Sequence, residues 1–115
     1  MHVALAGLLS ALLAGVPPTT ARFTLTGEVV DVQCLERGDG NRGAVHADCA
    51  LSCARRGAVL GLRTADGVYT ITGPFTLDTN RKLIEFVALT VRATGIVTQK
   101  DGRRLINVNA IVLDR

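Results

Sequence analysis

The pattern of apolar and polar positions predicts a chain made mainly of β-strands. The first predicted strand, 23–33, is rich in β-branched residues and largely alternates between apolar and polar positions, as a half-buried strand does. Tight turns at Asp66-Gly67 and Asp101-Gly102 join the later strands into hairpins. The four later strands are expected at 58–64, 67–72, 87–99 and 105–113.

Three further segments separate these strands. Residues 36–43 contain three glycines and no apolar residue, which predicts a loop. A short helix follows, with Asp48 as its N-cap and Gly57 as the left-handed residue after its end. Residues 78–86 are expected to form a loop with one or two helical turns, capped by Asp78 or Thr79.

Glycines inside two of the strands indicate how the sheet curves. Gly27 and Gly95 interrupt otherwise β-forming segments, which favours a bulge or a sharp bend, as in small barrels. The fold expected is therefore mostly β: a small five-stranded OB-like barrel with a short helix inserted after the first strand.

The N-terminal segment has the layout of a secretory signal peptide. Residues 3–16 are almost entirely apolar, and small residues at Thr19 and Ala21 suit cleavage after Ala21. The apolar run is shorter than the about twenty residues that a transmembrane helix needs. We therefore expect a presequence at 1–21 and one domain at 22–115, secreted or periplasmic, with an uncleaved segment as the only route to a membrane.

Composition excludes several function classes. A formal net charge of +3 with both signs interspersed does not predict a polyanion partner. Three Phe, one Tyr and no Trp give too few stacking platforms for a nucleic-acid surface. The sequence also shows no Ser-His-Asp grouping, glycine-rich phosphate loop or paired carboxylates, so a binding protein is favoured over an enzyme.

The most informative feature is a cluster of Cys34, His46, Cys49 and Cys53. It contains all three cysteines of the chain and one of its two histidines. Thiolates and imidazole are ligands for Zn²⁺, and two or three of them suffice for Cu(I). With Asp48 as the helix cap, His46 lies in the preceding loop and folds back over Cys49, while Cys34 approaches from the barrel wall. The four residues are therefore predicted to form a metal site.

Disulfide and redox chemistry remain alternatives for the same residues. A disulfide from Cys34 to Cys49 or Cys53 would add about 3 kcal/mol to a small domain. Cys49 and Cys53 within one helix are poorly disposed to pair, and three thiols leave one over. Cys49, expected at the first helical position, faces the positive end of the helix, which stabilises its thiolate and suits exchange with a partner protein. Asp31 is a candidate acceptor for a hydrogen bond from His46, although a solvated carboxylate at the strand end is the interpretation favoured.

These motifs resemble a group of small exported bacterial proteins. They share a pattern G-x-V-x-D-x-x-C, H-x-x-C-x-x-x-C and G, followed by a C-terminal strand pair with V-x-x-T-G-x-V, D-G and I-x-V. The resemblance implies an OB-type barrel of unassigned function in which Cys34, His46, Cys49 and Cys53 act together. The matching stretches are 26–34, 46–53, 57–62, 91–97, 101–102 and 106–108.

The sequence as a whole predicts a non-enzymatic binding protein for Zn²⁺ or Cu(I), or for a metal-containing cofactor, among which haem ranks below the bare ions. A thiol–disulfide redox protein acting with a partner protein is the second hypothesis. A structural interaction module stapled by one disulfide is the third.

Overall fold

The computed structural model describes residues 21–38 and 46–115 of the chain. Residues 1–20, nearly all of the predicted presequence, lie outside this part, so the presequence stays a prediction. Residue 21 already belongs to the first strand. In the described part, no helix is long and apolar enough to cross a membrane.

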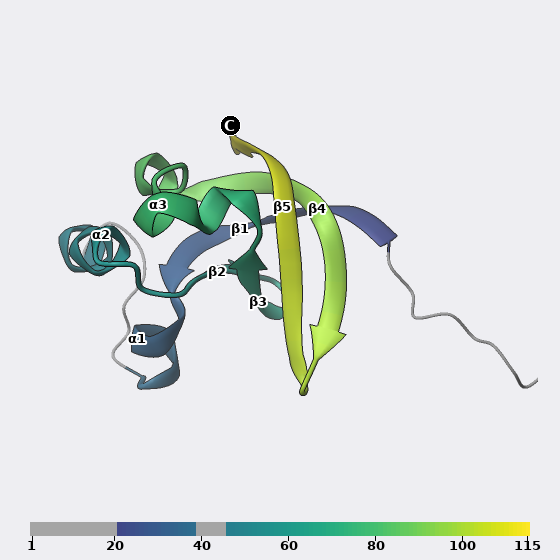
Figure 1. The fold of residues 1–115 in the computed structure, drawn as a ribbon, viewed down its shortest axis with the longest axis horizontal. Helices are drawn as coiled ribbons and strands as arrows, with labels where there is room; N and C mark the ends of the chain where they lie inside the picture. Colours follow the sequence, from purple (N-terminus) through teal and green to yellow (C-terminus); the bar gives the residue numbers. More distant parts are fainter. Residues whose placement is uncertain (1–20, 39–45) are drawn as a thin grey trace, which may run out of the picture.

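Five strands close into a barrel, which confirms the predicted mostly β, OB-like architecture (Figure 1). The strands lie in the order β1-β2-β3-β5-β4, and β4 pairs back onto β1. Among the five strands of the described part, β3 and β5 pair in parallel and the other neighbouring pairs are antiparallel. The strands are β1 (Ala21–Asp31), β2 (Leu60–Thr64), β3 (Gly67–Thr72), β4 (Thr90–Lys100) and β5 (Arg103–Leu113).

At both glycines predicted inside strands, a neighbouring strand comes too close to leave room for a side chain. A Cβ atom at Gly27 would come within 2.6 Å of the carbonyl oxygen of Arg63 on β2. A Cβ atom at Gly95 would collide with the backbone of Asn107, beside the register shift between β4 and β5. Because a side chain at either position would force the strands apart, glycine is required there for closure.

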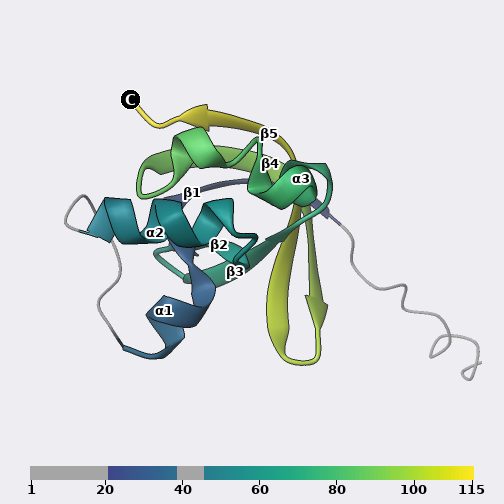
Figure 2. The same ribbon diagram turned by 60° about the vertical axis from the view of Figure 1, so that its left-hand side comes forward.

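Inward-facing apolar residues of all five strands fill the barrel, and one helix closes an end of it. The helix is α2 (Ala47–Arg55), which contributes the buried Ala50 and Ala54 to the core. In Figures 1 and 2, α2 lies beside α3 (Leu77–Asn80) on the same side of the barrel. The strand residues of the core are Val29, Leu60, Leu62, Tyr69, Ile71, Val91, Ala93, Ile106 and Val108.

The excursion after the first strand differs from the prediction in two respects. The strand ends at Asp31 rather than at residue 33, and a five-residue helix, α1 (Val32–Glu36), follows at once. The second helix begins at Ala47 with His46 as its N-cap, so Asp48 lies in the first turn instead of capping it. Gly57 takes the predicted left-handed conformation after the helix, with φ of 88°.

The segment between β3 and β4 contains short helical turns, as expected, but they begin earlier. A 3₁₀ turn, η3 (Pro74–Thr76), precedes α3, and a second, η4 (Ile84–Phe86), follows it. Asp78 and Thr79, the predicted caps, have φ values of 53° and 51° and lie in the left-handed region together with Asn80. Left-handed backbone is costly for residues other than glycine, so packing around Asn80 must hold this turn.

Candidate metal centre

The junction of β1 and α1 positions two donor side chains. Asp31 is the last residue of β1 and only 3 % exposed. Its carboxylate caps α1 by accepting a hydrogen bond from the backbone N–H of Cys34, with the nitrogen 3.2 Å from Oδ1. Because the cap fixes the first turn of α1, the Cys34 side chain is held next to the carboxylate. Cys34 is itself 7 % exposed.

Helix α2 brings the third donor from a separate part of the chain. Its buried Ala50 and Ala54 fix the rotation of the helix against the barrel, and this leaves Cys53 half-buried. The end of the helix is held by Asn80, whose Nδ2 donates to the carbonyl oxygens of Ala54 at 3.0 Å and Ala58 at 2.9 Å. The position of Cys53 therefore depends on the left-handed turn that presents Asn80.

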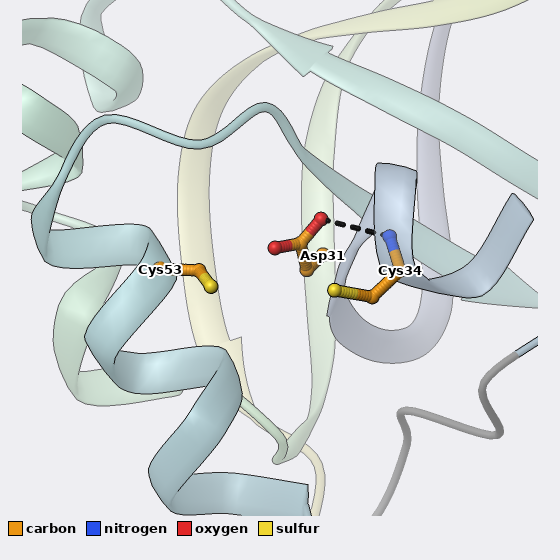
Figure 3. A group of neighbouring side chains, drawn as sticks. All are labelled: Asp31, Cys34 and Cys53. Atoms are coloured by element: carbon orange, nitrogen blue, oxygen red, sulfur yellow. Dashed lines mark hydrogen bonds between the residues drawn. The ribbon is translucent and has the colours of Figure 1, made fainter. Parts of the chain in front are cut away.

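Asp31, Cys34 and Cys53 form one cluster of potential ligands, which we call the Asp-Cys-Cys cluster. One carboxylate oxygen and the two sulfurs lie within 4.8 Å of one another. Figure 3 shows the two Sγ atoms pointing toward each other, with the Asp31 carboxylate beside them and its second oxygen directed toward Cys53. None of the three cysteines is in a disulfide. The cluster therefore lies between α1 and α2, and each of its three side chains can bind a metal ion.

An arginine contacts each sulfur of the cluster. Arg37 Nη2 donates to Cys34 Sγ at 3.3 Å, and Arg56 Nη2 donates to Cys53 Sγ at 3.6 Å. Together with the cluster, these arginines line a surface pocket of about 230 Å³. A cationic guanidinium group therefore stands beside each sulfur at the rim of the pocket.

The structure places the other two predicted ligands outside this cluster. His46 is half-buried at the N-cap of α2, and Cys49 is exposed in its first turn. Of the donor side chains within 21–38 and 46–115, the structure gathers only the Asp-Cys-Cys cluster. Cys34 and Cys53 are thus brought together, whereas concerted action of all four predicted residues stays a prediction.

Asp31 differs most from its predicted role. The favoured interpretation, a solvated carboxylate at the strand end, is wrong, because the side chain is buried and hydrogen-bonded to Cys34. A signal was present in the sequence: an Asp three residues before Cys34 is the spacing of a helix N-cap and its bonded N–H. This spacing, taken as an N-cap, predicts α1 and places the side chains of Asp31 and Cys34 next to each other.

Comparison of the chain with protein families, with curated proteins and with solved structures found no match. The function of the protein is therefore inferred from the geometry and chemistry of the Asp-Cys-Cys cluster.

Proposed function

We propose that the protein is a small exported binding protein that holds a transition-metal ion, Zn²⁺ or Cu(I), in the Asp-Cys-Cys cluster. The observation that carries the proposal is the convergence of two sulfurs and a carboxylate oxygen within 4.8 Å. Ligands about 2.3 Å from a common Zn²⁺ lie at most roughly 4.6 Å apart. Small side-chain rotations therefore suffice to bring all three donors to one ion.

The charges around the cluster support a bound cation held by thiolates. As metal ligands, two thiolates and a carboxylate carry three negative charges, and burying such a set without a counter-charge is costly. A metal ion supplies that counter-charge at the centre, while Arg37 and Arg56 supply it at the rim, where each contacts a sulfur. Donation of N–H groups to ligand sulfurs is also how outer residues orient the ligands of a metal site.

The pocket lining supports binding rather than catalysis. Three protein ligands leave one position of a tetrahedral ion open, as in sites that bind a further ligand. The pocket-lining residues supply no acid or base beyond the cluster and the two arginines. A reaction at the metal would need a separate proton carrier, whereas reversible binding or transfer of the ion needs only the open position.

The donor types separate the candidate ions. A carboxylate suits Zn²⁺, whereas Cu(I) prefers soft ligands and would use the two sulfurs alone. Haem fits poorly, because the cavity of about 230 Å³ is smaller than the roughly 300–1,000 Å³ of typical cofactor pockets. We therefore place Zn²⁺ first, Cu(I) second and haem last.

Metal analysis of protein purified from its exported form, without chelator or added reductant, tests the proposal. We expect about one equivalent of metal in the unmodified protein. Cys34→Ser and Cys53→Ser should each lose it, whereas Cys49→Ser, the matched control outside the cluster, should retain it.

Metal-free unmodified protein would reject this function. Equal metal loss in the Cys49→Ser protein would instead support the predicted set of Cys34, His46, Cys49 and Cys53.

A further inference from the structure

We propose that Cys53 and Cys34 also exchange with external disulfides, with Cys53 as the attacking thiol and Cys34 as the resolving thiol, so that oxidation releases the metal. The exchange chemistry depends only on the arrangement of the two thiols. Its regulatory consequence, loss of the metal, rests on the function proposed above.

The two sulfurs differ in access, as an attacking and a resolving thiol must. Cys53 is half-buried on α2 and lines the surface pocket, so an external disulfide can reach its sulfur. Cys34 is only 7 % exposed and is within 4.8 Å of Cys53. A large external molecule cannot easily reach Cys34, but a mixed disulfide formed on Cys53 lies directly beside it.

An arginine contacts each of the two sulfurs. Arg56 donates to Cys53 and Arg37 donates to Cys34, so a cation stands beside each sulfur during the exchange. The Asp31 carboxylate lies within 4.8 Å of both sulfurs. Electropositive, partly accessible surroundings of this kind are typical of reactive cysteines rather than of inert buried ones.

The exchange proceeds in two balanced steps. The Cys53 thiolate attacks one sulfur of a small disulfide such as oxidised glutathione, whose S–S bond breaks, and one thiolate leaves. Cys34 then attacks Cys53 Sγ, which forms the Cys34–Cys53 bond and expels the second glutathione thiolate. The protons that Cys53 and Cys34 lose pass through solvent to the two leaving thiolates. The two protein thiols are oxidised by two electrons, and the external disulfide is reduced to two thiols.

The fold allows this disulfide more readily than one within α2. Cys34 and Cys53 belong to different helices, and their Sγ atoms already point toward each other (Figure 3). A bond length of about 2.05 Å requires side-chain rotation and a small shift of the short helix α1. Cys49 and Cys53 are one turn apart on one regular helix, where Cβ atoms are poorly placed for a bond.

Oxidation removes two of the three ligands at once. A disulfide sulfur carries no negative charge and is not a thiolate ligand, so Asp31 alone would remain. The redox state of the surroundings thereby sets whether the metal is held.

Oxidised glutathione added to reduced, metal-free protein tests the exchange, with intact mass and peptide mapping under non-reducing conditions as the readout. The Cys49→Ser protein isolates the pair. It should lose the mass of two hydrogen atoms and yield a Cys34–Cys53 peptide, with no lasting adduct. In the Cys49→Ser, Cys34→Ser protein, one glutathione should stay attached at Cys53.

A rate comparison tests the assigned role of Arg56. Arg56→Gln should slow adduct formation at Cys53 several-fold, whereas Arg55→Gln, the neighbouring exposed arginine, should leave the rate unchanged.

A stable glutathione adduct without disulfide in the Cys49→Ser protein, or absence of the adduct when Cys34 is also removed, would overturn the exchange mechanism. Zinc titration of the reduced Cys49→Ser protein is the separate measurement of the proposed function. Formation of the disulfide without zinc binding would reject the metal site and support the exchange mechanism. Zinc binding without disulfide formation would support the metal site and reject the exchange mechanism.

Discussion

At the residue scale, Asp31 links local structure to chemistry. Its carboxylate caps α1 through the Cys34 N–H and at the same time stands beside both sulfurs. The sequence alone indicated that Cys34 and Cys53 are candidate ligands, because cysteine chemistry is apparent from residue type. It did not indicate the burial of Asp31, because that burial depends on how α2 docks against the end of β1.

Asp31→Asn separates these two roles. Asn is as good an N-cap as Asp, so the free energy of unfolding of the metal-free protein should change by less than about 1 kcal/mol. The amide is a much poorer zinc ligand than the carboxylate. Zinc affinity should therefore fall about tenfold or more, since in other metal sites even the loss of a residue that only hydrogen-bonds a ligand has an effect of that size. Competition with a chromophoric zinc chelator, together with urea unfolding, measures both.

Asp48→Asn, on the exposed first turn of α2, is the matched control and should leave zinc affinity unchanged. Cu(I) affinity should be similar in all three proteins, because the two sulfurs alone suit that ion. Unchanged zinc affinity in the Asp31→Asn protein would remove the carboxylate from the site.

At the element scale, the left-handed turn of α3 holds the end of α2. Asp78, Thr79 and Asn80 all have positive φ, and the buried Asn80 donates to the carbonyl oxygens of Ala54 in α2 and of Ala58 shortly after it. The sequence predicted that this segment contains helical turns. It did not predict the left-handed conformation, because the segment has no glycine to indicate it. The two hydrogen bonds of Asn80 offset the cost of the left-handed backbone, and they form only once α2 is in place.

Asn80→Gly tests this support. Glycine adopts the φ of 63° without strain, so the substitution removes the two hydrogen bonds while keeping the backbone conformation. We expect a loss of about 2–3 kcal/mol in the free energy of unfolding, measured by urea denaturation. The metal affinity of the folded protein should also fall, because Cys53 is less firmly held.

Asp78→Gly is the matched control in the same turn. Asp78 is exposed and also left-handed, so glycine there should be neutral or stabilising by up to about 1 kcal/mol. Equal destabilisation by both substitutions would show that the turn, rather than the Asn80 hydrogen bonds, carries the effect.

At the scale of the whole molecule, the barrel is the scaffold on which two distant parts of the chain meet. Strand number and hairpin turns followed from the sequence, because one-sided burial imposes alternation and tight turns require particular residues. Gly95 lies at the register shift between β4 and β5, as predicted, whereas Gly27 lies at a close approach of β1 to β2. Helix α1 was not predicted, since a five-residue helix is too short to show helical periodicity and only the Asp31 cap marks it in the sequence.

The candidate site was predictable only in part, because a local pattern identifies the residue types but not which of them meet. Cys34, His46, Cys49 and Cys53 are close in sequence, and the pattern treated them as one group. The helix begins at Ala47, which places Cys49 on the exposed side of its first turn, while Cys53 faces α1. Which cysteines converge was decided by the docking of Ala50 and Ala54 on the core, a tertiary contact that no local pattern specifies.

X-ray absorption spectroscopy of the zinc-loaded, reduced protein decides whether the Asp-Cys-Cys cluster holds the ion, because it identifies and counts the atoms bound to zinc. We expect two sulfurs at about 2.3 Å with oxygen at about 2.0–2.2 Å, and no imidazole scattering. Three sulfurs with an imidazole nitrogen, or oxygen and nitrogen ligands without sulfur, would contradict it.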